Sequence, residues 1–393
     1  MRVGPTWQCV EFGRDPYAWQ RSVGGGGLIE DRELGGWIVA DYRLARQVLA
    51  GPRFLKAPDR ALPGPYTDRM QELSGSSLLF MDPPDHGRIR ATMRDRFRPA
   101  AVKELGPSLK NAAVDAVRNW QTAGTDFVAG AALPYAIDVL ACVLGVRTPD
   151  REMFVENTRL LVREFSVPLD SPEQRLIVGA KVELVAYLLE ELEARQGLAG
   201  DLLGDLIGAQ RDGRLSAEEM ISAALSVLVA GVQPMADALA NGVYQLAGHA
   251  DQQQLLRSRP DLLANAVEEV LRHDSSVTLT DRVAAADLTL GRCPVQRGQW
   301  MFPALALANH DARVSPAPTE FDISRPSILH SSFGAGAHYC LGAGLARAAL
   351  MAFFETLLQE SVRIDLADTG ASRRSEVPAS RGFVALWIAV AWR

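Results

Sequence analysis

The stretch Phe333-Gly-Ala-Gly-Ala-His-Tyr-Cys-Leu-Gly-Ala-Gly-Leu-Ala-Arg347 decides the fold, because in it a glycine-rich turn delivers Cys340 to the start of an apolar helix. A sulfur atom in that place faces unpaired N–H groups of the first helical turn, such as that of Gly342, and the positive end of the helix dipole. Such surroundings lower the pKa of a thiol and favour the charged form that binds a metal ion. Gly334 and Gly336 permit a tight turn, and Gly342 lets a flat group approach the helix backbone.

Three other interpretations of Cys340 compete with a metal ligand. A buried structural cysteine is the default for a single cysteine without a surrounding motif. A dinucleotide fingerprint fails, because Gly334-x-Gly336 is followed by Tyr339 where the third glycine should stand, and no clear strand precedes it. A cysteine nucleophile needs a histidine base; His338 is close in sequence, but a spacing of two residues does not predict a hydrogen bond.

The composition of the 393 residues is that of an ordinary globular protein, with 48% hydrophobic residues and a formal net charge of -6. No block of lysine or arginine is present, so a nucleic-acid partner is not expected. The N-terminus lacks a signal peptide or membrane anchor pattern, and the apolar stretch 221–248 is interrupted by polar residues, which predicts a buried helix and no membrane partner. The scattered cysteines, at positions 9, 142, 293 and 340, indicate a reducing, cytoplasmic location.

Helical periodicity dominates the chain and predicts a mainly α protein with a small β region. No interdomain linker or internal repeat is apparent, so one domain over 1–393 is expected. A proline-rich segment between about 291 and 335 is expected to be irregular, and long ordered loops are often functional. Helices are predicted at 41–50, 86–97, 101–120, 135–145, 151–165, 173–195, 216–247, 260–273 and 341–360, and strands at 36–40, 282–284, 288–290 and 383–391.

The frame Phe333-x-x-Gly336-x-x-x-Cys340-x-Gly342, with His338 inside it and Leu345-Ala346-Arg347 after it, resembles the haem-binding signature of the cytochrome P-450 family. This resemblance implies the cytochrome P-450 fold and a haem b (iron protoporphyrin IX) whose axial ligand is Cys340. The haem would lie between a long distal helix and the proximal helix that follows the cysteine loop. A thiolate ligand of this kind pushes electron density onto the iron.

Glu269-Val-Leu-Arg272 supports the resemblance by its order and distance from Cys340 rather than by its pattern, since Glu156-Asn-Thr-Arg159 has the same spacing. Residues three apart on a helix share one face, so an ordinary surface ion pair is the simplest interpretation of either motif. The resemblance implies more for the first: a buried charge cluster of Glu269, Arg272 and Arg325 that holds the irregular segment beneath the haem.

Haem propionates would be held from two sides. His86 and Arg90 lie four residues apart in a predicted helix and can converge on one carboxylate, although a solvated basic helix face explains the same pattern. The resemblance assigns Arg282 and His338 to the opposite side. The family therefore implies four cationic or donor groups around two propionates.

The predicted helix 216–247 matches the distal helix of the family, and its centre carries the expected catalytic positions. Ala230 and Gly231 are small enough to leave room for dioxygen over the iron. The acid and threonine that follow in typical members are replaced by Gln233 and Pro234. Glutamine does not ionise near neutral pH, and proline has neither hydroxyl nor N–H, so we expect a kinked helix without the usual proton relay.

The resemblance implies an oxidoreductase, of monooxygenase or oxidative coupling type, that oxidises a small molecule in bacterial secondary metabolism. Electrons would come from ferredoxin and ferredoxin reductase, for which arginines 94, 98 and 347 are candidate contacts or simply solvated charges. The loss of the acid and threonine favours C–C or C–N coupling of an indole, phenol or cyclic peptide. Three alternatives remain open: ordinary hydroxylation in which ordered water replaces the lost groups, peroxide-driven chemistry, and a haem protein without catalytic activity. Peroxygenase relatives share the proline at this position but have an arginine before it, where this chain has Gln233. Pocket residues are expected in 60–80 and 165–175, around Val229 and Gln233, at Ser276–Thr280 and at Gly382–Val384.

Overall fold

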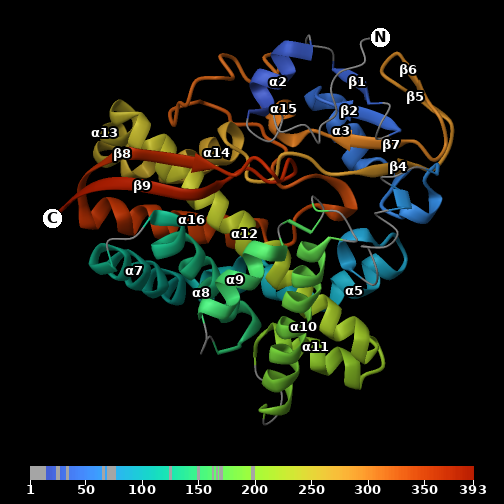
Figure 1. The fold of residues 1–393 in the computed structure, drawn as a ribbon, viewed down its shortest axis with the longest axis horizontal. Coiled ribbons are helices and arrows are strands. Elements are labelled where there is room, and N and C mark those ends of the chain that lie inside the picture. The colour runs from blue at the N-terminus through green and yellow to red at the C-terminus, as the bar shows by residue number, and fades with distance from the viewer. Residues whose placement is uncertain are drawn as a thin grey trace.

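The computed structural model describes residues 15–23, 27–31, 35–63, 67–68, 77–123, 126–147, 151–161, 163–164, 167, 171–195 and 200–393. Helices form most of it, as the sequence predicts (Figure 1). The α-helices are α2 (Pro16–Val23), α3 (Tyr42–Ala50), α5 (Asp85–Met93), α6 (Pro99–Glu104), α7 (Gly106–Ala123), α8 (Leu133–Leu144), α9 (Arg151–Leu161), α10 (Pro172–Glu193), α11 (Leu202–Arg211), α12 (Ala217–Gly248), α13 (Ala250–Ser258), α14 (Leu263–His273), α15 (Leu305–Asn309) and α16 (Ala343–Glu360).

Short 3-10 helices and one π-helix extend or connect these elements. They are η1 (Pro58–Arg60), η2 (Leu78–Phe80), η3 (Arg94–Phe97), η4 (Val128–Ala132, the π-helix), η5 (Pro260–Leu262) and η6 (Gly336–His338). The predicted helix 101–120 is in fact two helices, α6 and α7, which separate at Leu105, because Pro107, two residues later, lacks the N–H that a continuous helix would need.

The β structure forms one mixed sheet and two hairpins. Its strands are β1 (Leu28–Asp31), β2 (Gly36–Val39), β3 (Phe54–Leu55), β4 (Arg282–Ala284), β5 (Leu288–Leu290), β6 (Cys293–Val295), β7 (Trp300–Pro303), β8 (Ser361–Arg373) and β9 (Phe383–Trp392). The sheet has the order β1-β2-β7-β4-β3, in which only β2 and β7 run parallel, while β5–β6 and β8–β9 pair separately. Because β6, β7 and α15 occupy 293–309, the segment expected to be irregular from 291 is so only after Asn309.

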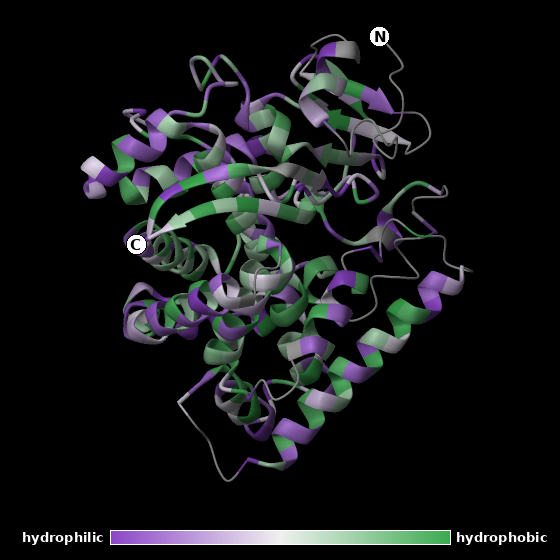
Figure 2. Ribbon diagram, turned by 60° about the vertical axis from the view of Figure 1, so that its left-hand side comes forward, coloured by the Kyte–Doolittle hydropathy of each residue, from purple (hydrophilic) through white to green (hydrophobic). Residues whose placement is uncertain are grey.

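The longest helix, α12, crosses the middle of the molecule and lies against α8, α14, α16 and the β8–β9 hairpin (Figure 1). It begins with a capping box, in which Ser216 and Glu219 exchange side-chain and backbone hydrogen bonds. Outer helices alternate polar and apolar bands along their length (Figure 2), as amphipathic helices do. By length and composition α12 is apolar enough to cross a membrane, but 61% of its most apolar window is buried in the molecule.

Candidate functional site

The cysteine loop has the tight geometry that its glycines predict. Gly334 and Gly336 have φ values of +69° and +71°, a region that favours glycine. A Cβ atom on Gly336 would lie 2.6 Å from the Cα of Ala50, so the loop packs directly against α3. The N–H of Cys340 donates to the carbonyl of Phe333 at 2.9 Å, which closes the loop just before α16 begins. The backbone therefore fixes the position of the sulfur atom.

The surroundings of the Cys340 thiol differ from the sequence prediction in one respect. The prediction that the pKa of the thiol is lowered was wrong, because burial raises it, and the Gly342 N–H, Arg90 and Arg347 offset this effect only in part. Gly342 has φ near -84°, and a Cβ added to it would meet only Phe97 Cε1, at 3.9 Å. The protein's own packing thus gives no reason for glycine at 342, whereas the close approach of a flat ligand does.

His86, Arg90, Arg282 and His338 converge from separate parts of the chain, as the resemblance implies. The rings of His86, on α5, and His338, in η6, have centroids 4.0 Å apart. A guanidinium nitrogen of Arg90 donates to the carbonyl of Tyr339 at 2.5 Å. Burial, followed by the charges of Arg282 and other neighbours, lowers the pKa of His338 to about 2, so this ring is neutral. The result is a concentrated region of positive potential beside the cysteine loop.

This cluster contains more donors than the described protein groups satisfy. Among the described residues, neither Arg90 nor Arg282 forms an ion pair with a carboxylate, although Arg282 is only 3% exposed. Within the described part of the chain, the buried Nε2 atom of His338 has no hydrogen-bond partner. Buried charges and buried donors are normally satisfied. A group with two carboxylates, such as haem b, fits this donor set.

Lys56 belongs to the same region, and the sequence analysis missed it. Its Nζ atom lies 2.8 Å from Oδ1 of Asp281, the residue before Arg282, and both side chains are buried. Burial lowers the pKa of Lys56, although the Asp281 carboxylate opposes this effect. No motif marks a lysine at the end of a short strand, so only the fold reveals this pair.

At the centre of α12, Ala230 is exposed, whereas the next residue, Gly231, packs closely against α8. Ala230 is exposed, although it stands in the middle of the longest helix. A Cβ on Gly231 would lie 2.7 Å from Cδ1 of Leu140, so α12 packs closely on α8 there, and a larger residue would force the Leu140 side chain to shift. The helix continues through Pro234, which cannot donate to the carbonyl of Ala230.

Gln233 is 3% exposed and belongs to a polar network that the sequence analysis did not predict. Its Nε2 donates to Oδ1 of Asp237, one turn later, at 2.9 Å. The other oxygen of Asp237 accepts from Arg374 and from the hydroxyl of Ser380. A Cβ on Gly382 would lie 2.0 Å from Oδ1 of Asp237. The turn between β8 and β9 is therefore bonded to the helix at the predicted catalytic position.

Two of the segments expected to line the pocket, Ser276–Thr280 and the region around Gly382, are connected by backbone hydrogen bonds. The N–H of Thr278 donates to the carbonyl of Ala379 at 3.0 Å, and that of Arg381 donates to the carbonyl of Ser276 at 2.8 Å. These bonds connect the segment Ser276–Thr280 to the β8–β9 turn. Of the other ranges, residues 64–66, 69–76, 165–166 and 168–170 lie outside the described residues.

The predicted cluster around Glu269 is confirmed. Its carboxylate accepts from Nε of Arg272 at 2.7 Å and from Nε of Arg325 at 3.0 Å, and the Glu269 and Arg272 side chains are fully buried. Arg272 also donates to the carbonyls of Pro318 and Glu320. The two arginines thus hold the segment after Asn309 against α14.

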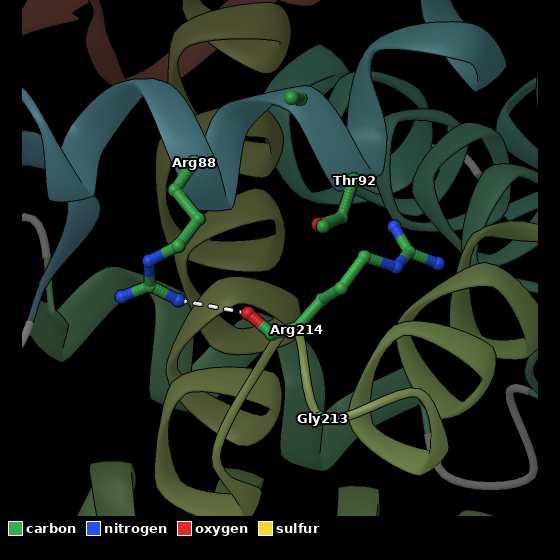
Figure 3. A pocket seen from close by; sticks show the side chains of 5 residues that line it. Arg88, Thr92, Gly213 and Arg214 are labelled. Carbon is green, nitrogen blue, oxygen red and sulfur yellow. Dashed lines mark hydrogen bonds between the residues drawn. The ribbon is translucent and has the colours of Figure 1, made fainter.

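A surface hollow of about 460 Å³ lies between α5 and the turn before α12, and it does not share the features of this site (Figure 3). Arg88 and Arg214 line it, and Arg88 donates to the carbonyl of Arg214 at 2.8 Å. The Arg88 guanidinium is already bound by Glu219 and Asp85. Arg214 pairs with Asp212 at 3.1 Å, so both arginines that line the hollow already have carboxylate partners among the described residues.

The fold and the cysteine loop with its donor cluster define a haem-thiolate protein, and comparison with known proteins agrees. Residues 183–364 match the model of the family "Cytochrome P450". Nocardicin C N-oxygenase of Nocardia uniformis subsp. tsuyamanensis is 33% identical over 84% of this chain and 83% of that protein. 6-Deoxyerythronolide B hydroxylase of Saccharopolyspora erythraea is 32% identical over 86% of this chain and 87% of that protein.

Solved structures agree over the whole chain. CxnD, described as the enzyme for C–S bond formation in chuangxinmycin biosynthesis, superimposes with a TM-score of 0.88 and 30% identity, over 100% of this chain and 98% of that one. CalO2 gives the same TM-score and identity over 99% of each chain. The chain belongs to the cytochrome P-450 family. It is accordingly an oxidoreductase that uses haem b, a monooxygenase of bacterial secondary metabolism that acts on a small molecule with the help of redox partners.

Proposed function

We propose that Cys340 is the axial ligand of haem b in a single catalytic domain spanning 1–393. His86, Arg90, Arg282 and His338 would hold the two propionates. The observation that carries this proposal is the donor cluster beside the cysteine loop, whose charges have no carboxylate partner among the described residues. When bound, the haem supplies the activation of dioxygen with electrons from a donor, for which we propose ferredoxin and ferredoxin reductase.

We propose further that the enzyme joins two atoms of its substrate by oxidation, as in C–C or C–N coupling of an indole, phenol or cyclic peptide. In hydroxylation, one oxygen atom enters the substrate, and dioxygen with two electrons and two protons gives the alcohol and one water. In coupling, the substrate loses two hydrogen atoms, and the same inputs give the coupled product and two waters. Coupling therefore inserts no oxygen and draws hydrogen from the substrate itself.

The residues at positions 233 and 234 support coupling. An ionisable acid at position 233 would pass protons to the reaction centre, but the Gln233 amide does not ionise and its Nε2 is bound to Asp237. Pro234 has no hydroxyl and no N–H. An N–H or O–H of the substrate can supply the proton that these residues lack. The similarity to CxnD, described as forming a C–S bond, is consistent with this chemistry.

The haem-thiolate assignment is tested by the spectrum of the reduced protein with carbon monoxide. Wild-type protein should show the red-shifted Soret band of a thiolate-ligated carbonyl haem, and Cys340→Ser should lose it. Protein that is reconstituted with haem and lacks this band would refute the assignment of Cys340.

Coupling is tested with labelled dioxygen and the native substrate, once ligand-induced spin-state changes have identified it. Wild-type enzyme with ferredoxin should give a coupled or ring-closed product without label, and the double variant Gln233→Glu with Pro234→Thr should gain hydroxylation. Efficient incorporation of label by the wild type would exclude coupling. Turnover supported better by peroxide than by ferredoxin would indicate the peroxygenase alternative.

A further inference from the structure

Glu268 lies beside the buried Glu269 on α14 but forms a separate set of bonds toward the cysteine loop. Its carboxylate accepts from Nε of Arg347 at 2.5 Å and from a terminal guanidinium nitrogen of the same residue at 2.9 Å. It also accepts from Nε2 of His330 at 2.9 Å, while Nδ1 of His330 accepts from the N–H of Ser332 at 3.2 Å. The neutral histidine tautomer with its proton on Nε2 satisfies both bonds.

The ion pair between Glu268 and Arg347 is partly buried. Partial burial raises the pKa of Glu268, but hydrogen bonds from His330 and Arg347 outweigh this effect and lower it to about 2. The side chains of Glu268 and Arg347 are 27% and 31% exposed, respectively. A bidentate bond between a guanidinium and a carboxylate fixes the plane of the guanidinium. Glu268 therefore holds Arg347 in one orientation and matches its charge.

The fixed guanidinium lies over the aromatic ring of Phe333, with a distance of 4.5 Å from its central carbon to the ring centroid. This is the geometry of a cation–π contact. The carbonyl of Phe333 in turn accepts the hydrogen bond from the N–H of Cys340 at 2.9 Å. A continuous set of contacts thus leads from the Glu268 carboxylate through Arg347 and Phe333 to the backbone of Cys340.

We propose that Glu268 is a positioning residue for Cys340, which it holds in place through Arg347 and the ring of Phe333. The inference rests on the proposed role of Cys340 as the axial ligand. It also assigns Arg347 to the support of the loop rather than to docking of an acidic redox partner. By contrast, the exposed Arg94 and Arg98 each form an ion pair with Asp95, which is exposed as well.

The test compares holoenzyme variants by spectroscopy. Glu268→Gln removes the charge that orients Arg347, and Arg347→Lys keeps a cation but loses the planar bidentate contact. Both should increase, by several-fold over the wild type, the fraction of carbonyl complex that lacks the thiolate-type Soret band. Both should also change the electron paramagnetic resonance spectrum of the ferric low-spin haem. The apparent KM for ferredoxin should stay unchanged in Arg347→Lys.

Glu355→Gln is the matched control, because Glu355 is a glutamate on α16 that likewise pairs with a cation, Lys110, at 2.8 Å, but has no described contact with the cysteine loop. This variant should keep wild-type spectra. If Glu268→Gln resembles Glu355→Gln in both spectra, the positioning role is refuted. A raised KM for ferredoxin in Arg347→Lys with unchanged spectra would assign Arg347 to docking instead. A wild-type protein without the thiolate-type band would refute the proposed function itself, so the two failures are distinct.

Discussion

Replacing Glu269 by alanine removes the acceptor that neutralises two buried arginines. The carboxylate accepts from Arg272, from Arg325 and from the N–H of Asp322. Without it, the partners that the described residues leave to the fully buried Arg272 are backbone carbonyls. Removing one partner of a buried ion pair costs about 3–5 kcal/mol. For a chain of this length, the entropy of unfolding converts that loss to a fall in Tm of about 4–6 °C.

The measurement is thermal unfolding of Glu269→Ala beside Glu156→Ala, together with the yield of holoprotein. Glu156 has the same spacing to Arg159, but both residues are exposed, and no ion pair joins them in the structure described above. Its replacement should change Tm by less than about 1 °C, because an exposed side chain without an ion pair contributes little to stability. If the two variants lose stability equally, burial of the charge does not determine the cost, and the reasoning is wrong.

Two further predictions concern haem retention and pH. His86→Ala and Arg90→Ala should each release haem faster, since each removes a charge-assisted hydrogen bond worth about 1.5–3 kcal/mol. The rate of haem transfer to an apoprotein acceptor measures this release. Wild-type rates in both variants would contradict the assignment of these residues to a propionate. Burial lowers the pKa of His310 to about 3, so below pH 6.5 the unfolded chain binds a proton at this histidine that the folded protein does not bind. The free energy of unfolding therefore decreases as the pH is lowered, by up to about 1.4 kcal/mol per pH unit. His310→Gln should therefore show a shallower loss in denaturant unfolding between pH 6.5 and 5, and an identical slope would exclude His310 as the cause.

Much of the site could be predicted because its residues occur in short motifs with fixed spacing. The positive φ values of Gly334 and Gly336 follow from a turn that only glycine adopts easily. The Glu269 cluster was implied by the resemblance to the family, since the spacing alone favours an ordinary surface ion pair, and the structure confirms its ion pairs. The long helix was predicted from helical periodicity, and in the structure it begins with the capping box of Ser216 and Glu219.

The parts that could not be predicted depend on contacts between distant segments. Asp237 meets Arg374 and Ser380 only because the β8–β9 hairpin packs on α12. The raised pKa of Cys340 depends on burial by the whole fold, which outweighs the local effect of the helix start. Strand β7 was missed because it lies in the proline-rich segment that was expected to be irregular, and it ends at Pro303.

The bonding of Asp237 to the β8–β9 turn has a consequence for attempts to change what the enzyme accepts. Substitutions in this turn cannot be chosen independently of the helix, since Gly382 has no room for a side chain and Ser380 donates to a buried carboxylate. A combinatorial library that randomises 374–382 freely would consist largely of variants with an unsatisfied acid beneath the turn. Libraries that keep Arg374, Ser380 and Gly382 and vary 375–379 should yield many more folded enzymes, so new selectivity is best sought there.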